Sequence, residues 1–163
     1  MCNHVMRYAV IALSTLFAMS AFGQVRVSAF TTGPDNGLGG SVEVRATPHW
    51  AVELAASSAK HKLTIGGIFT GHVIEFRTRD IDLTAHYYFV NTTRWQPFLG
   101  GGVHHVTTSS DEVEDRTSAI VDGGVHFMIT PSFSIRIAGK GLLNDDVSYD
   151  SGLKAEVGVG WRF

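Results

Sequence analysis

Three histidines are the first candidates for chemistry, because each lies on the polar side of an alternating segment. His86, His104 and His126 belong to three separate segments of this kind, and imidazole is a frequent ligand of zinc and copper. A metal site needs several ligands that converge on one point. Histidines on polar faces also serve as hydrogen-bonded fillers, and we expect this second role, with no metal and no cofactor.

A nucleophilic enzyme would need a hydroxyl or thiol beside a general base. No Gly-x-Ser-x-Gly element occurs, and the only cysteine is Cys2. The nearest candidate is the element His104-His105-Val106-Thr107, which contains no serine. We therefore expect a protein that is not an enzyme and name no catalytic residue, with a lipid-modifying enzyme as the third alternative.

Charged residues of both signs share the polar faces of the alternating segments. A balanced set predicts mutual pairing inside a closed structure, because buried charges must be paired. The acidic members are Glu43, Glu53, Asp80, Asp82, Asp122 and Glu156, and the basic members are Arg26, Arg45, Arg136, Lys140, Lys154 and Arg162.

Eight segments of period-two alternation position these residues and predict strands. They lie near residues 25–30, 41–46, 50–55, 80–89, 98–104, 121–129, 133–140 and 153–163. Three connections are tight (47–49, 91–94 and 130–132), and four are longer (near 31–38, 57–79, 107–117 and 143–152). Short turns that alternate with long loops are typical of outer-membrane proteins. We predict an all-β fold, an eight-stranded antiparallel up-and-down transmembrane β-barrel, in preference to a secreted soluble barrel.

The N-terminal residues predict a cleaved signal peptide at residues 1–23. A short apolar run from Tyr8 to Phe17 follows a basic start, and Ala21-Phe22-Gly23 fits the cleavage pattern. The run is shorter than the ~20 residues that a spanning helix needs. We expect residues 24–163 to form the barrel domain in the bacterial outer membrane. No basic patch occurs, so nucleic acid is not an expected partner.

Aromatic residues accumulate beside the tight turns, where they suit the interface between lipid and water. The interfacial candidates are Trp50, Trp95, Phe133 and Trp161, and those at the opposite end are Phe30, Phe69, Phe76 and Tyr149. The alternation changes phase near Arg77–Arg79. We expect a β-bulge or the membrane boundary there, with basic groups that meet lipid head groups.

The segment between residues 57 and 79 contains apolar residues that a plain solvent-exposed loop would lack. It fits an extended hairpin that turns at Gly66-Gly67 and forms an apolar channel mouth, or a packed hairpin with no solute role. The candidate mouth residues are Leu63, Ile65, Ile68 and Phe69.

Several segments resemble the OmpW-like family of outer-membrane proteins, with OmpA-like barrels next closest. They include His86-Tyr87-Tyr88-Phe89, Pro97-Phe98-Leu99-Gly100-Gly101-Gly102-Val103 and Gly160-Trp161-Arg162-Phe163. The resemblance implies a narrow channel for small hydrophobic compounds and a terminal aromatic, Phe163, that the barrel assembly machinery recognises. The expected partners are this machinery, outer-membrane lipid and lipopolysaccharide, and a small hydrophobic solute. The alternative is a structural or adhesive barrel with a plugged lumen and no transport.

Overall fold

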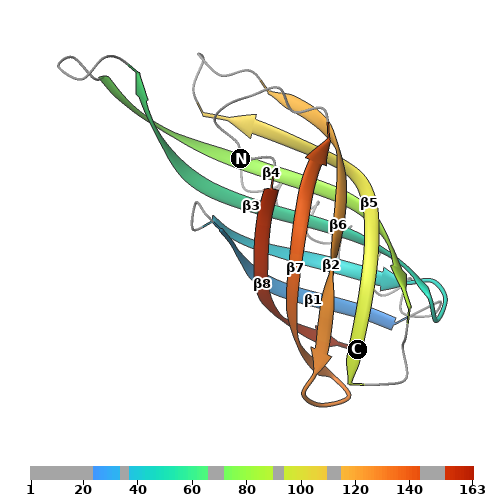
Figure 1. Cartoon of the computed structure of the whole chain (residues 1–163). Coiled ribbons are helices and arrows are strands. Elements are labelled where there is room, and N and C mark those ends of the chain that lie inside the picture. The colour runs from blue at the N-terminus through green and yellow to red at the C-terminus, as the bar shows by residue number, and fades with distance from the viewer. Residues whose placement is uncertain (1–23, 34–36, 66–71, 90–93, 110–114, 144–152) are drawn as a thin grey trace, which may run out of the picture.

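The computed structural model describes residues 24–33, 37–65, 72–89, 94–109, 115–143 and 153–163, with side chains except at 61–65 and 72–75. These residues form eight strands, each paired with its sequence neighbours, and β1 closes the barrel against β8 (Figure 1). The predicted antiparallel barrel is confirmed. The described residues contain no helix of the length and apolar character needed to cross a membrane. The strands are β1 (Gln24–Gly33), β2 (Gly37–Arg45), β3 (Trp50–Ile65), β4 (His72–Tyr88), β5 (Trp95–Thr108), β6 (Arg116–Met128), β7 (Phe133–Leu143) and β8 (Leu153–Arg162).

Each ladder keeps a single register from end to end. A constant register fixes the face of every side chain, so the polar residues face inward and the apolar residues face outward. Leu54 and Leu83, which lie opposite each other, are each 54% exposed on the outer wall. This arrangement is the reverse of a soluble barrel and suits a wall surrounded by lipid.

The β-bulge expected near Arg77–Arg79 is absent from the described strands, where Arg77 pairs with Lys60 and Arg79 with Ser58 in one continuous ladder. The phase change in the sequence has another cause. Phe76 is 5% exposed and faces the lumen, although its neighbours on that face are mostly polar. Because Phe76 is an apolar residue on a mostly polar inward face, the sequence pattern resembled a shift in register.

The barrel wall has an uneven height. The connection predicted at 31–38 is shorter than expected, because β1 extends to Gly33 and β2 begins at Gly37. The ladder between β2 and β3 ends at Ser58, whereas β3 and β4 stay paired to Ile65 and His72. Their hairpin projects beyond the other strands (Figure 1). The wall is therefore low at β1–β2 and high at β3–β4.

Two inward-facing glycines allow neighbouring strands to approach closely. A Cβ atom on Gly102 would lie 1.9 Å from the carbonyl oxygen of Leu83, and one on Gly124 would lie 2.3 Å from that of Ile137. Both obstacles are backbone atoms, which cannot move without disturbing a ladder. Glycine is required where β4–β5 and β6–β7 curve around the narrow lumen.

We predict that Gly102→Ala lowers the unfolding free energy by ~1–3 kcal/mol, the usual cost of overpacking. Gly139→Ala is the matched control, because a Cβ there meets nothing within 4 Å. Urea unfolding in lipid vesicles, followed by the different gel mobilities of folded and unfolded barrel, measures both variants. Equal stability of the two variants would contradict this account of the lumen.

Candidate functional site

The inward faces of the strands form a polar interior. All the charged residues predicted for the lumen face it. Lys154 and Arg162 are half-buried, and the others are buried. The buried members are Arg26, Glu43, Arg45, Glu53, Asp80, Asp82, Asp122, Arg136, Lys140 and Glu156.

The main ion pairs cross the lumen. In a ring of eight strands, β7 lies opposite β3 and β8 lies opposite β4. Arg136 Nη1 on β7 lies 2.5 Å from Glu53 Oε2 on β3. Lys154 Nζ on β8 lies 3.2 Å from Asp80 Oδ2 on β4. In both of these pairs the acid lies on β3 or β4 and the base lies on the facing strand, β7 or β8.

Two basic groups on β7 link further acids to this arrangement. Lys140 Nζ lies 2.7 Å from Asp82 Oδ2 and 2.6 Å from Glu156 Oε1. Arg136 Nη2 lies 3.5 Å from Asp122 Oδ2 and 3.7 Å from Glu156 Oε2. Shared partners connect the pairs into one network that extends along the lumen.

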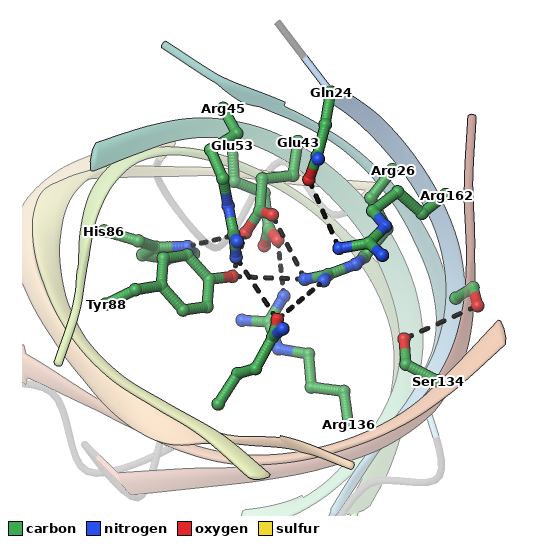
Figure 2. A network of polar contacts seen from close by, with 12 residues as sticks. Gln24, Arg26, Glu43, Arg45, Glu53, His86, Tyr88, Ser134, Arg136 and Arg162 are labelled. Carbon is green, nitrogen blue, oxygen red and sulfur yellow. Dashed lines mark hydrogen bonds and ion pairs between the residues drawn. The ribbon is translucent and has the colours of Figure 1, made fainter. Parts of the chain in front are cut away.

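The part of the network nearer the short-turn end centres on Glu43 (Figure 2). Arg26 Nη1 lies 3.1 Å from Glu43 Oε1, and the Tyr88 hydroxyl donates a hydrogen bond to the same carboxylate. Arg26 Nη1 also donates to the Tyr88 hydroxyl oxygen at 3.2 Å. The two ring nitrogens of His86 lie 3.3 Å from Glu43 and 2.9 Å from Asp122. These contacts join β1, β2, β4 and β6 across the interior.

Two of the arginines contact neutral groups among the described residues, so the pairing of charges is less complete than their balance suggests. The Arg45 guanidinium lies 4.0 Å above the centre of the Tyr88 ring and donates to Gln96 at 3.4 Å. Arg162 donates to Gln24 at 3.2 Å and to the carbonyl of Pro131 at 2.6 Å. Both arginines end their strands at the short-turn side, where Arg162 is half-buried and the buried Arg45 is held by the Tyr88 ring and Gln96 in place of a carboxylate.

The three inward histidines do not converge on one point. His104 Nδ1 lies 2.5 Å from Asp82 Oδ1, whereas His86 bonds Glu43 and Asp122. The ring of Phe98 packs on both other rings, with centroid distances of 4.8 Å to His86 and 5.3 Å to His126. His126 is buried with neither ring nitrogen hydrogen-bonded within the described chain. The histidines therefore fill the lumen separately.

One group of potential metal ligands does come together, although sequence analysis did not single it out. One donor atom from each of Glu43, Glu53 and His86 lies within 4.8 Å of the others. Arg26 and Arg136 already pair with these two carboxylates. Their guanidinium groups supply the positive charge that a metal ion would bring, so the cluster fits a salt-bridge network better than a metal site.

Thr84, His86 and Glu43 have the order hydroxyl, imidazole and carboxylate that a nucleophilic triad uses. Thr84 Oγ1 lies 3.1 Å from His86 Nε2. However, Thr84 and Glu43 are each 3% exposed and His86 is 0% exposed. Asp122 also occupies the same ring nitrogen. The geometry fits a structural crosslink and provides no access for a substrate.

The outer wall carries an aromatic belt at the short-turn end. Trp50, Trp95 and Trp161 are 52%, 58% and 51% exposed, and Phe133 packs on Trp161 with ring centroids 6.2 Å apart. Phe163 is 75% exposed, and its backbone N–H donates to Val25.

The opposite belt differs from the prediction. Phe30 and Phe76 are 3% and 5% exposed and face the lumen, because they share the inward faces of Arg26 and Asp80. Phe69 and Tyr149 lie outside the described residues. So do Ile68, from the predicted channel mouth, and residues 1–23. Leu63 and Ile65 belong to β3, but their side chains are not described.

The family of this protein follows from a match between residues 7–160 and the model of the OmpW family. The chain belongs to the OmpW family. It is a bacterial outer-membrane protein, as are the proteins of similar solved structure. A search of curated proteins found no significant match.

Solved structures share the fold of this OmpW-family barrel at low sequence identity. Outer membrane protein OprG of Pseudomonas aeruginosa matches with a TM-score of 0.67 and 15% identity, covering 86% of this chain and 96% of OprG. The N-terminal β-barrel domain of Pseudomonas aeruginosa OprF has a TM-score of 0.66 and 20% identity, covering 86% and 98%. Neisserial surface protein A has a TM-score of 0.56 and 16% identity, covering 86% and 95%.

Sequence analysis missed the neutral members of the network. Tyr88 and Gln96 are 0% and 3% exposed and bridge charged groups from different strands. The available signal was their face, because Tyr88 shares the alternation of His86 and Asp82. A count restricted to charged residues could not reveal them.

We predict that the pair formed by Arg136 and Glu53 couples β7 to β3. Glu53→Gln should lower the unfolding free energy by ~3 kcal/mol, because it leaves a buried guanidinium without its nearest carboxylate. Arg136→Met should cost at least as much. The double variant should lose ~1–3 kcal/mol less than the sum of the two single losses. Urea unfolding in vesicles measures this cycle, and strictly additive losses would show that the pair makes no direct contribution.

Proposed function

We propose that this OmpW-family barrel binds small hydrophobic solutes at its extracellular side and releases them laterally into the membrane. The proposal rests on one observation, the division of the inward faces into a central polar network and a distal apolar group. The network contains bases and acids that meet across the lumen, such as Arg136 with Glu53. An eight-stranded interior is only wide enough for side chains to fill, so the network opposes passage along the barrel axis.

The apolar group lies nearer the long-loop side. Phe30, Phe76, Val106 and Ile120 are 3%, 5%, 8% and 2% exposed and face inward from β1, β4, β5 and β6. Each is farther from the short-turn end than a polar or charged lumen residue of its own strand. Polar groups remain among them, because Thr32 and Thr78 are buried on the same inward faces and the Lys154–Asp80 pair lies near the rim. A solute that enters from outside therefore meets apolar side chains before the central ion pairs.

The uneven wall suggests the exit. The β1–β2 side ends near Gly33 and Gly37, while β3 and β4 rise well beyond it. An apolar solute that leaves over the low side reaches lipid without crossing the charged network. This route needs no continuous water path.

A structural or adhesive barrel is the second candidate, and the closed network supports it as well. A lumen sealed by ion pairs gives a rigid wall, whatever the outer loops contact. The two proposals differ in whether the distal apolar side chains contact a solute.

We predict that the unmodified protein shows little or no ion conductance in planar bilayers. Wide aqueous channels require barrels of ~16 strands, and this lumen is filled by paired side chains. Large stepwise currents of the porin type would contradict the closed lumen and remove the basis of the lateral route.

We predict that Ile120→Asn weakens binding of a fluorescent apolar probe by roughly tenfold, because an uncompensated amide among apolar groups costs more than 1.4 kcal/mol. Ile120→Val is the matched control, since it keeps the position apolar. Titration of the probe into vesicles with and without folded protein measures the difference. Identical probe binding by the two variants would favour the structural or adhesive barrel.

A further inference from the structure

On the outward face of the β3–β4 hairpin, the residue types change with their depth in the membrane. Its cross-strand pairs begin with aromatic residues at the short-turn end, continue with apolar residues and finish with basic ones. A strand tilted ~40° rises about 25 Å from Trp50 to Lys60, which is about the height of the apolar band of such barrels. Lys60 therefore lies at the outer boundary of the membrane. The successive pairs are Trp50–Tyr87, Val52–Ala85, Leu54–Leu83, Ala56–Ile81, Ser58–Arg79 and Lys60–Arg77.

The basic residues at this boundary stand apart from the other charges of the barrel. Among strand residues with described side chains, the charges on the outward face are Lys60, Arg77 and Arg79, and all three are exposed. No carboxylate within that part of the chain forms a salt bridge with them. The Arg77 backbone N–H donates to the Ser109 hydroxyl at 3.0 Å, which leaves its guanidinium uninvolved in that contact.

The register places these like charges close together. Lys60 lies directly opposite Arg77, and Arg79 follows on the same face of β4. Residues that are directly opposite have Cβ atoms ~5 Å apart, and successive residues on one face of a strand are ~7 Å apart. Like charges in such positions destabilise a ladder. The next pair outward, Lys62 with Glu75, lies beyond the described side chains. No described carboxylate neutralises the cluster of Lys60, Arg77 and Arg79, which therefore suits an anion supplied from outside the chain.

We infer that the cluster of Lys60, Arg77 and Arg79 binds the phosphate groups of lipopolysaccharide in the outer leaflet. The cluster lies on the lipid-facing wall at the end with long connections, which is the extracellular end of an outer-membrane barrel. Lipopolysaccharide presents phosphates on its sugar backbone at that boundary. Arginine binds phosphate with two parallel hydrogen bonds, and a neighbouring lysine adds a third charge. The site is separate from the proposed solute route and does not depend on it.

The test uses the full-length protein folded in vesicles of neutral phospholipid. Fluorescent lipid A that carries both phosphates is titrated in the presence of EDTA, so that divalent cations cannot bridge phosphate to carboxylate. Binding should weaken about fivefold for each basic residue that is replaced by glutamine. The triple variant, Lys60→Gln with Arg77→Gln and Arg79→Gln, should lose about a hundredfold.

Matched controls separate the site from general electrostatics. Arg94→Gln removes an exposed positive charge at the short-turn end and should leave lipid A binding unchanged, whereas Arg79→Gln should weaken it. Dephosphorylated lipid A should bind the unmodified protein as poorly as the phosphorylated form binds the triple variant. Gel mobility before and after boiling verifies folding, and the single variants carry the test if the triple variant does not fold. Equal binding by Arg79→Gln and Arg94→Gln would overturn the inference, as would equally tight binding of phosphatidylglycerol or inorganic phosphate.

Discussion

The barrel depends on the pairing of the charged groups in its lumen, and the ion pair between Arg136 and Glu53 is an example. Charged groups inside a lumen that only side chains can fill must find partners there, because unpaired buried charges are very costly. The two residues are 83 positions apart in sequence and lie on opposite walls. Contacts of this kind tie facing strands together and add to the hydrogen bonds that join neighbouring strands.

This constraint also explains what lies beside the charges. Tyr88 contributes a hydroxyl to Glu43 and its ring to Arg45. Phe98 packs between His86 and His126. Gly102 lacks the Cβ atom that would clash with the backbone of Leu83 on the neighbouring strand. Tyr88, Phe98 and Gly102 each supply either a contact group or the space that the charged residues need. Together with the charged residues they fill the polar interior.

Alternation in the sequence predicted the strand number and the faces of the charged residues, because a period of two is a local property. The alternation of short turns with long loops predicted the barrel. The strand from Leu153 to Arg162 illustrates this well. Contact partners were beyond reach, since Lys140 meets Asp82 only after tilt and register bring β7 and β4 to the same height. Phe76 shows a second limit of prediction from sequence, because its apolar character did not indicate that its side chain faces the lumen. The predicted length of the β1–β2 connection was wrong for a similar reason, because glycine and threonine occur in both strands and loops.

The two faces of the wall follow different rules for charge because they meet different surroundings. Inside, each acid of the network lies near a base, as in Lys140 with Glu156, so the chain neutralises its own charges and they stabilise the fold. Outside, Lys60 and Arg77 are directly opposite and equal in sign. The fold gains nothing from holding them together in water. No described carboxylate pairs with them, and their position agrees with the inference that phosphate of the surrounding membrane supplies the negative charge.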